Sequence, residues 1–157
     1  MKLGKIKEID IRKVWAHEQY DFSKWLAAEE NIKELGDSLN LSLTDVETEK
    51  FVGSYRCDII CKDELSGKAV LIENQLEQTN HDHLGKIITY ASGLDASVVV
   101  WIVAEAREEH ASAIEWLNKH CDSKHTARKL ARRWSRHDVK THRLTHEKKE
   151  HLLLIKN

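Results

Sequence analysis

The first third of the chain carries apolar residues at helical spacing. Residues 4–10 alternate weakly between apolar and polar positions, which predicts a short edge strand. Ser23 then stands where a helix N-cap is expected, because the apolar positions from Trp25 to Leu39 recur at spacings of three and four residues. Gly36 lies inside this stretch and indicates a kink or a break there. The pattern predicts a helical segment with one apolar face.

From residue 41 onward the hydrophobic period becomes that of β-strands. Residues 41–49, 55–62 and 69–74 each combine apolar and polar positions in the way that strands do. The link over residues 63–68 has turn-forming residues and the length of a hairpin loop, and Gly53 marks another turn or a bulge. We therefore expect three consecutive strands in a meander.

The remaining elements alternate between helix and strand. Asp82 is expected to cap a helix that ends at Gly93. Residues 97–103 are almost entirely apolar, which is typical of a strand buried on both faces. A further helix is expected over residues 105–118. This order predicts an α/β (α+β) sandwich, with a mixed central sheet of about four to five strands flanked by helices.

The charges divide the chain into two parts. Residues 1–120 hold 14 basic and 22 acidic residues, whereas residues 121–157 hold 11 basic and 4 acidic residues and five of the ten histidines. We interpret the first part as one folded domain and the second as a basic tail, helical or disordered. Such a tail suits a polyanion such as nucleic acid, but it is equally typical of a solvated terminal segment.

Other features of the composition exclude membrane and secreted classes. No apolar stretch is long enough for a transmembrane helix, and the N-terminal residues lack the apolar core of a secretion signal. The three cysteines are too few, and odd in number, for a disulfide framework. We therefore expect a cytoplasmic protein with no membrane partner.

Two carboxylates are predicted to meet on neighbouring strands. If residues 55–62 and 69–74 form a hairpin, Asp58 and Glu73 can lie side by side, and Gln75 shares the face of Glu73. Two close carboxylates repel one another, and a hard divalent cation such as Mg²⁺ or Mn²⁺ removes that repulsion. The alternative is a solvated sheet face on which these charges pair with Arg56 or Lys68.

The order of these elements resembles a known nuclease core. A strand with Asp58, a turn, a strand with Glu73-Asn74-Gln75 and a following helix are similar to the PD-(D/E)XK, or restriction-endonuclease-like, module. The run VLIENQLEQTNHDHLGKIITYASG over residues 70–93 resembles more closely a family of uncharacterised prokaryotic proteins that carry such a module. The resemblance implies a restriction-endonuclease-like core that binds a divalent metal and cleaves or binds DNA or RNA.

The resemblance spans residues 8–118 and is most specific over residues 56–118. It implies that Asp58 and Glu73 are metal ligands, although Cys57 replaces the usual proline before the aspartate. It also implies that Glu18, near the first helix, is the extra acidic ligand that many members carry.

One position departs from the pattern of active members. Gln75 stands where most of them place a lysine that positions or activates the attacking water, and a glutamine cannot supply a positive charge. Lys86 on the following helix is a candidate substitute, and Arg56 a candidate for the scissile phosphate. The segment from Lys86 to Tyr90 resembles a Gln-x-x-x-Tyr element of some branches, which adds Tyr90 to the nucleic-acid-binding candidates.

Two further groups of residues are candidates for binding. His81 and His83 lie at a helix start, where they can bind a metal or a phosphate, or serve only as capping and surface residues. In the tail, Trp134 lies in a basic segment and can stack on a base while neighbouring arginines contact phosphates. The tail is either a lineage-specific basic arm or the result of a truncation or frameshift. Its candidate residues are Arg128, Arg132, Arg133 and Trp134.

Two functions are compatible with the sequence. The first is a divalent-metal-dependent nuclease, with Asp58, Glu73, Gln75 and Lys86 as catalytic residues and Mg²⁺ or Mn²⁺ as cofactor. The second is a catalytically inactive module that binds nucleic acid or a protein partner, because Gln75 replaces the lysine. The expected nucleic acid is DNA, and a homodimer is an expectation from the fold alone.

Overall fold

The computed structural model describes Trp15 and residues 21–120 and 151–156. The strand expected at residues 4–10 lies outside the described residues. So do Glu18 and the tail residues Arg128, Arg132, Arg133 and Trp134.

The described part of the chain forms one five-stranded mixed sheet in the order β1-β2-β3-β4-β5. The three-strand meander is antiparallel, β4 runs parallel to β3, and β5 closes the far edge antiparallel to β4. The strands are β1 (Leu43–Val52), β2 (Tyr55–Asp63), β3 (Ala69–Gln78), β4 (Val98–Glu105) and β5 (His151–Lys156).

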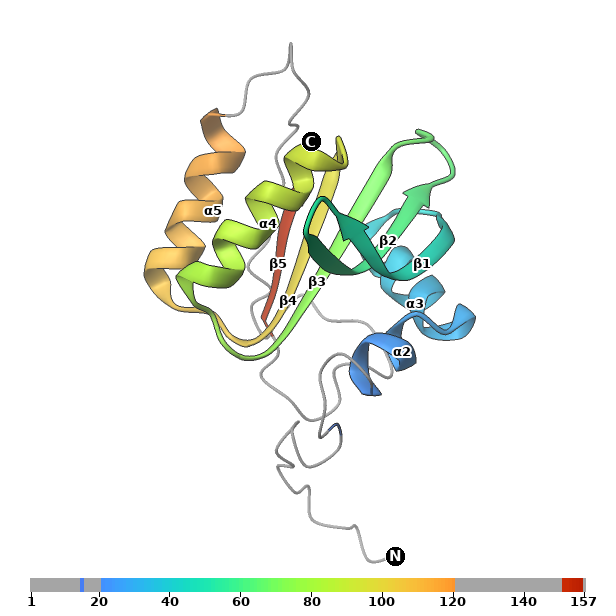
Figure 1. Cartoon of the computed structure of the whole chain (residues 1–157), viewed down its shortest axis with the longest axis horizontal. Coiled ribbons are helices and arrows are strands. Elements are labelled where there is room, and N and C mark those ends of the chain that lie inside the picture. The colour runs from blue at the N-terminus through green and yellow to red at the C-terminus, as the bar shows by residue number, and fades with distance from the viewer. Residues whose placement is uncertain (1–14, 16–20, 121–150, 157) are drawn as a thin grey trace, which may run out of the picture.

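Helices cover the two faces of the sheet (Figure 1). α4 (His81–Gly93) connects β3 to the parallel strand β4, as a parallel connection requires, and α5 (Glu108–His120) lies beside it. The short α2 (Ser23–Leu26) and α3 (Glu29–Leu39) pack on the opposite face. The predicted fold class, a mixed central sheet flanked by helices, is confirmed.

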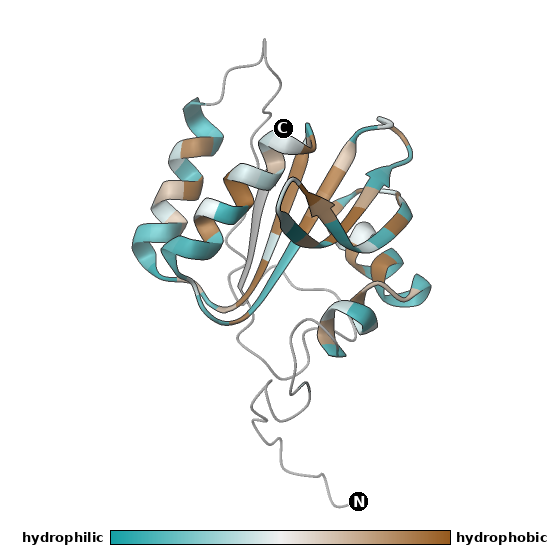
Figure 2. Ribbon diagram, viewed as in Figure 1, coloured by the Kyte–Doolittle hydropathy of each residue, from teal (hydrophilic) through white to brown (hydrophobic). Residues whose placement is uncertain are grey.

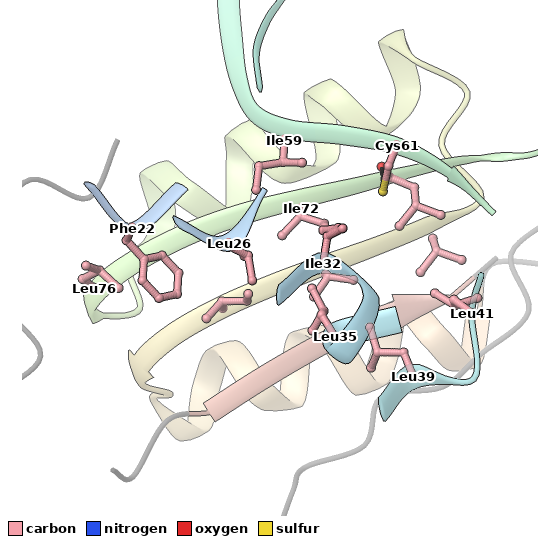
Figure 3. Close-up of a cluster of buried hydrophobic side chains, with 14 residues drawn as sticks. Phe22, Leu26, Ile32, Leu35, Leu39, Leu41, Ile59, Cys61, Ile72 and Leu76 are labelled. Atoms are coloured by element: carbon pink, nitrogen blue, oxygen red, sulfur yellow. Dashed lines mark hydrogen bonds between the residues drawn. The ribbon is translucent and has the colours of Figure 1, made fainter. Parts of the chain in front are cut away.

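Each face of the sheet has its own core. Figure 3 shows the first, where Leu26, Ile32 and Leu35 of α2 and α3 pack on Ile59 and Ile72 of the sheet. The second lies under α4 and α5. Burial from Val98 to Val103 confirms that β4 is buried on both faces. The buried members of the second core are Cys57, Ile60, Leu71, Ile87, Tyr90, Ala96, Val99, Trp101, Val103 and Ile114.

Alternation along β3 places its polar residues on both faces. Figure 2 shows the strand changing from hydrophobic to hydrophilic along its length. Leu71 belongs to the core under α4 and α5, and Ile72 to the core under α3. By this alternation Glu73 and Gln75 share one face, as predicted, and that face is the one under α4 and α5, while Asn74 faces α2.

The helix boundaries differ from the sequence prediction. Ser23 lies inside α2, whose N-cap is Phe22, and the break falls at Ala27 and Ala28 rather than at Gly36. Gly36 is helical and lies close to the chain that leads into β1: a Cβ there would meet the carbonyl oxygen of Leu41 at 2.8 Å. Its small size serves packing and not a kink.

Two other boundaries also differ. Asn80, and not Asp82, caps α4, because its side chain accepts a hydrogen bond from the main-chain nitrogen of His83 at 2.9 Å. Residues 151–156, which we placed in the tail, form β5 of the sheet. Residues 121–150 lie outside the described residues, so the division into a domain and a tail stays a prediction there.

Candidate active site

The central feature is the point where β2 and β3 stop pairing. Their ladder runs from Lys62 and Ala69 to Ile59 and Ile72. Beyond it, Oδ2 of Asp58 accepts a hydrogen bond from the main-chain nitrogen of Asn74 at 2.8 Å. Oε1 of Glu73 accepts one from the main-chain nitrogen of Asp58 at 3.3 Å. Carboxylates thus take the place of ladder carbonyls, which brings Asp58 and Glu73 together where the strands separate.

Glu73 is buried, and its charge acts on two neighbours. It is 4% exposed, on the face covered by α4. Burial, and secondarily the Glu73 carboxylate, raises the pKa of Tyr90 to about 12. The same two causes raise the pKa of the Cys57 thiol to about 11. Both groups are therefore neutral at physiological pH, and neither adds a negative charge beside the carboxylates.

One of the two polar atoms of the Gln75 side-chain amide forms a hydrogen bond within the described residues, and the other does not. Its Nε2 donates to the carbonyl oxygen of Gln78 at 2.9 Å, which orients the amide. Its Oε1 is buried and has no hydrogen-bond partner within the described part of the chain. A buried acceptor without a donor costs about 1–3 kcal/mol, so this oxygen favours a donor such as a water. The residue is 1% exposed and shares the face of Glu73.

The donor set fits a hard divalent cation only in part. Among the described residues, no three His, Cys, Asp or Glu side chains are close enough to hold a metal together. Asp58 and Glu73 are two carboxylates, and Mg²⁺ is commonly held by one or two carboxylates with waters completing its shell. The chain's own residues therefore fit a magnesium-type site that is completed by water and substrate.

A bend in the β1–β2 hairpin adds an ion pair to this region. Glu49 has a left-handed φ of +58°, and the pairs Thr48–Ile59 and Lys50–Cys57 on either side place it opposite Asp58. Oε2 of Glu49 accepts from Nε of Arg56 at 2.6 Å. A left-handed glutamate inside a strand is strained, and such strain is common at functional sites. Sequence reasoning did not single out Glu49, because its backbone conformation has no pattern in the sequence.

The bend also corrects the predicted alternation along β2. Strict alternation along β2 puts Cys57 on the same face as Ile59 and Cys61, but Cys57 packs in the core under α4 whereas Ile59 and Cys61 pack under α3. The tip of the hairpin lies over α4, where the Tyr55 and Tyr90 ring centroids are 6.2 Å apart (Figure 1).

The two candidates on α4 have different environments. Lys86 is exposed, while Ile87 and Tyr90 are the buried positions of the helix. Tyr90 is 2% exposed, so its ring is covered by the protein and is part of the core beside Glu73. The catalytic role of Lys86 and the nucleic-acid-binding role of Tyr90 stay predictions.

The histidines of α4 interact with other groups. Nδ1 of His81 lies 2.6 Å from Nε2 of His110, and Nδ1 of His110 lies 2.7 Å from Oγ1 of Thr79. His83 lies against its capping residue Asn80, and burial lowers its pKa. Sequence reasoning missed His110, although its spacing of four residues from Ile114 puts it on the apolar face of α5.

Comparisons with known proteins give one solved structure to report. A repair endonuclease from Pyrococcus abyssi is similar, with 14% sequence identity and a TM-score of 0.49. The similarity covers 67% of this chain and 45% of that one, so this chain spans less than half the length of that protein. No family model matches the sequence, and no curated protein matches it. Among the described residues, no helix is long and apolar enough to cross a membrane.

Proposed function

We propose that this protein is a divalent-metal-dependent nuclease of the PD-(D/E)XK type, acting on DNA. The observation that carries the proposal is a pair of hydrogen bonds where β2 and β3 separate. The Asp58 carboxylate accepts from the main-chain nitrogen of Asn74, and the Glu73 carboxylate accepts from the main-chain nitrogen of Asp58. These bonds hold the two carboxylates at one place in the sheet. Gln75, on the same face of β3 as Glu73, has a buried acceptor oxygen with no donor among the described residues.

Each residue of the site has its own role in the proposed reaction. Asp58 and Glu73 hold Mg²⁺ or Mn²⁺, and Glu18 is the proposed third acidic ligand. A bound divalent cation would stabilise the negative charge that develops on a phosphodiester and make an attacking water more acidic. Oε1 of Gln75 accepts a hydrogen bond from that water and orients it.

Arg56 supplies the positive charge that Gln75 lacks. It lies two residues before Asp58, and its ion pair with Glu49 fixes the direction of the guanidinium. Arginine stays charged at any physiological pH and has donors left over for a phosphate after one bond to a carboxylate. Lys86, exposed on α4, is the second cation in reach of a substrate that lies over the site.

Cleavage assays with matched variants test the proposal. Single-stranded and duplex DNA and RNA are incubated with wild type and Asp58→Asn in Mg²⁺, Mn²⁺ or EDTA. Asp58→Asn should remove metal-dependent cleavage, because an amide binds a hard cation poorly. The control is Glu30→Gln, an exposed carboxylate on α3, which should cleave like wild type. Equal cleavage by wild type and purified Asp58→Asn contradicts the assignment.

A second function is favoured by one specific observation, the neutral Gln75 at the lysine position. In this case the protein is a catalytically inactive module that binds nucleic acid or a protein partner. Its signature is nucleic-acid binding that weakens steeply with salt and persists in Asp58→Asn, without cleavage in either protein.

The contribution of the basic residues in 121–157 to binding is best tested by neutralising their charges and not by deleting the segment. Removal of residues 121–157 would also remove β5 from the sheet. Substitution of Arg128, Arg132 and Arg133 by glutamine keeps the strand and should lower the salt dependence of binding. Unchanged affinity and salt dependence would contradict a role for these arginines.

A further inference from the structure

The outward face of α5 carries a large aromatic side chain between charged and small ones. Glu109, Ser112, Trp116 and Lys119 follow one another at spacings of three, four and three residues, which places them along one stripe of the helix. We call these four residues the α5 stripe. All four are exposed, Trp116 by 58%, and the buried residues of α5 lie on the opposite side of the helix. α5 lies at the outer edge of the described structure, so a partner can reach the stripe (Figure 1).

The ring of Trp116 is held in place by His120. The two rings are stacked, with centroids 4.6 Å apart and planes inclined by 20°. Nδ1 of His120 donates a hydrogen bond to the main-chain carbonyl oxygen of Trp116 at 2.8 Å, which fixes the imidazole. A ring that is already ordered loses less conformational entropy when a partner covers it. An exposed, ordered tryptophan is therefore well suited to anchor an interface.

The two ends of the α5 stripe carry opposite charges. Glu109 belongs to the acidic first turn of α5, and Lys119 to its basic last turn. Neither forms an ion pair with another residue in the part of the chain that the structure describes. The spacing of three, four and three residues is the same in both directions along the helix. When two α5 helices lie antiparallel, Glu109 of one is therefore level with Lys119 of the other, and Trp116 is level with Ser112.

We propose that the α5 stripe is the interface of a homodimer, in which two copies of this chain pair their α5 helices antiparallel about a two-fold axis. Trp116 then packs over the small Ser112 of the second copy, and the two-fold axis repeats each contact. A parallel pairing would set glutamate against glutamate and lysine against lysine, so the charges select the antiparallel arrangement. This inference goes beyond the proposed nuclease function and does not rest on it.

The size of the interface sets how tightly the two copies bind. α5 has 13 residues, and one pair of such helices forms a small contact. Stable, specific interfaces bury about 1,200–2,000 Å² in total, and a contact between two short helices lies at or below the lower end of this range. The dimer should therefore form at high protein concentration and dissociate on dilution.

Sedimentation velocity of the full-length protein, from low to high micromolar concentration, tests the dimer. Wild type should shift from monomer to dimer as the concentration rises. Trp116→Ala should raise the dissociation constant of the dimer by about 30-fold or more, the loss that is typical of a buried interface anchor. Two controls should dimerise like wild type: Ser112→Ala, which keeps a small side chain, and Leu65→Ala, which removes an exposed apolar side chain far from α5 on the β2–β3 turn.

Charge reversal tests the antiparallel arrangement. In a homodimer Glu109→Lys sets lysine against lysine, and Lys119→Glu sets glutamate against glutamate, so each variant alone should stay monomeric. An equimolar mixture of the two variants should form a heterodimer, because opposite charges then meet at both ends of the helix pair. A variant that had merely unfolded could not show this recovery.

Three results would overturn the proposal. The first is a wild type that stays monomeric at every concentration. The second is a wild-type dimer that Trp116→Ala leaves unchanged, which would place the interface on another face. The third is a wild-type dimer combined with a monomeric mixture of Glu109→Lys and Lys119→Glu, which would exclude the antiparallel pairing of α5.

Discussion

Asn74 connects α2 to the carboxylate site. Its Nδ2 donates to Oγ of Ser23 at 2.8 Å, between two buried side chains 51 residues apart, while its main-chain nitrogen donates to Asp58. A single residue of β3 thus fixes the helix on one face of the sheet and a carboxylate at the strand separation. Stability and site geometry are coupled through it.

The first prediction concerns this link. Ser23→Ala leaves the buried Nδ2 of Asn74 without its acceptor, and the free energy of unfolding should fall by about 1–3 kcal/mol. Urea unfolding followed by circular dichroism measures the change. Ser112→Ala, at an exposed position of α5, is the matched control and should change stability by less than about 0.5 kcal/mol. Equal stability of the two variants would mean that the Ser23–Asn74 bond contributes nothing.

Metal binding gives the second prediction. Isothermal titration calorimetry with Mn²⁺ should show binding to wild type that disappears in Asp58→Ala/Glu73→Ala, because the two carboxylates are the proposed ligands. Glu30→Gln should bind like wild type. Retention of the same binding heat by the double variant would place the metal elsewhere in the chain.

The third prediction is a loss of stability at mildly acidic pH. Burial, followed by the neighbouring His81, lowers the pKa of His110 below its ordinary value of 6.5, with Arg107 lowering and Glu109 raising it. The unfolded chain therefore binds this proton more readily than the folded protein. The stability contribution is complete above pH 6.5 and is lost as the pH falls through the lowered folded pKa.

Protonation also acts on the hydrogen bond itself. Protonation of His110 makes its Nε2 a donor only, so this nitrogen can no longer accept a hydrogen bond from Nδ1 of His81. Thermal unfolding measured from neutral pH downward should show a smaller pH dependence for His110→Gln than for wild type. His120→Gln, at an exposed position, should keep the wild-type profile; a wild-type profile in His110→Gln would contradict the assignment.

Two helical glycines make opposite predictions. At Gly85 of α4 an added Cβ meets nothing within 4 Å, so Gly85→Ala should raise the free energy of unfolding by about 0.5–1 kcal/mol through helix propensity. At Gly36 the same Cβ would lie 2.8 Å from the Leu41 carbonyl oxygen, which is backbone and cannot turn away. Gly36→Ala should therefore destabilise the protein despite its higher helix propensity. Urea unfolding of both variants decides, and stabilisation by Gly36→Ala would mean that α3 and β1 are not held in close contact.

The amino-acid pattern by itself determined the sequence of elements from Ser23 to His120. The two-residue period over β1, β2 and β3 and the continuous apolar run of β4 follow directly from which faces must be buried, so the meander, the parallel strand and the sandwich could be predicted. The same alternation placed Glu73 and Gln75 on one face. Which side chains of these strands are buried is visible in the order of apolar and polar residues along each strand.

Only the tertiary structure revealed the backbone conformation and the hydrogen bonds at the point where β2 and β3 separate. The left-handed Glu49, the main-chain hydrogen bonds that the Asp58 and Glu73 carboxylates accept, and the packing of Cys57 in the core under α4 all occur near the point where β2 leaves β3. The partners of Ser23 and His110 lie far along the chain, at Asn74 and His81, and β5 pairs with a strand separated from it by residues 106–150. Contacts across such separations depend on how the layers pack, and no period in the sequence encodes them.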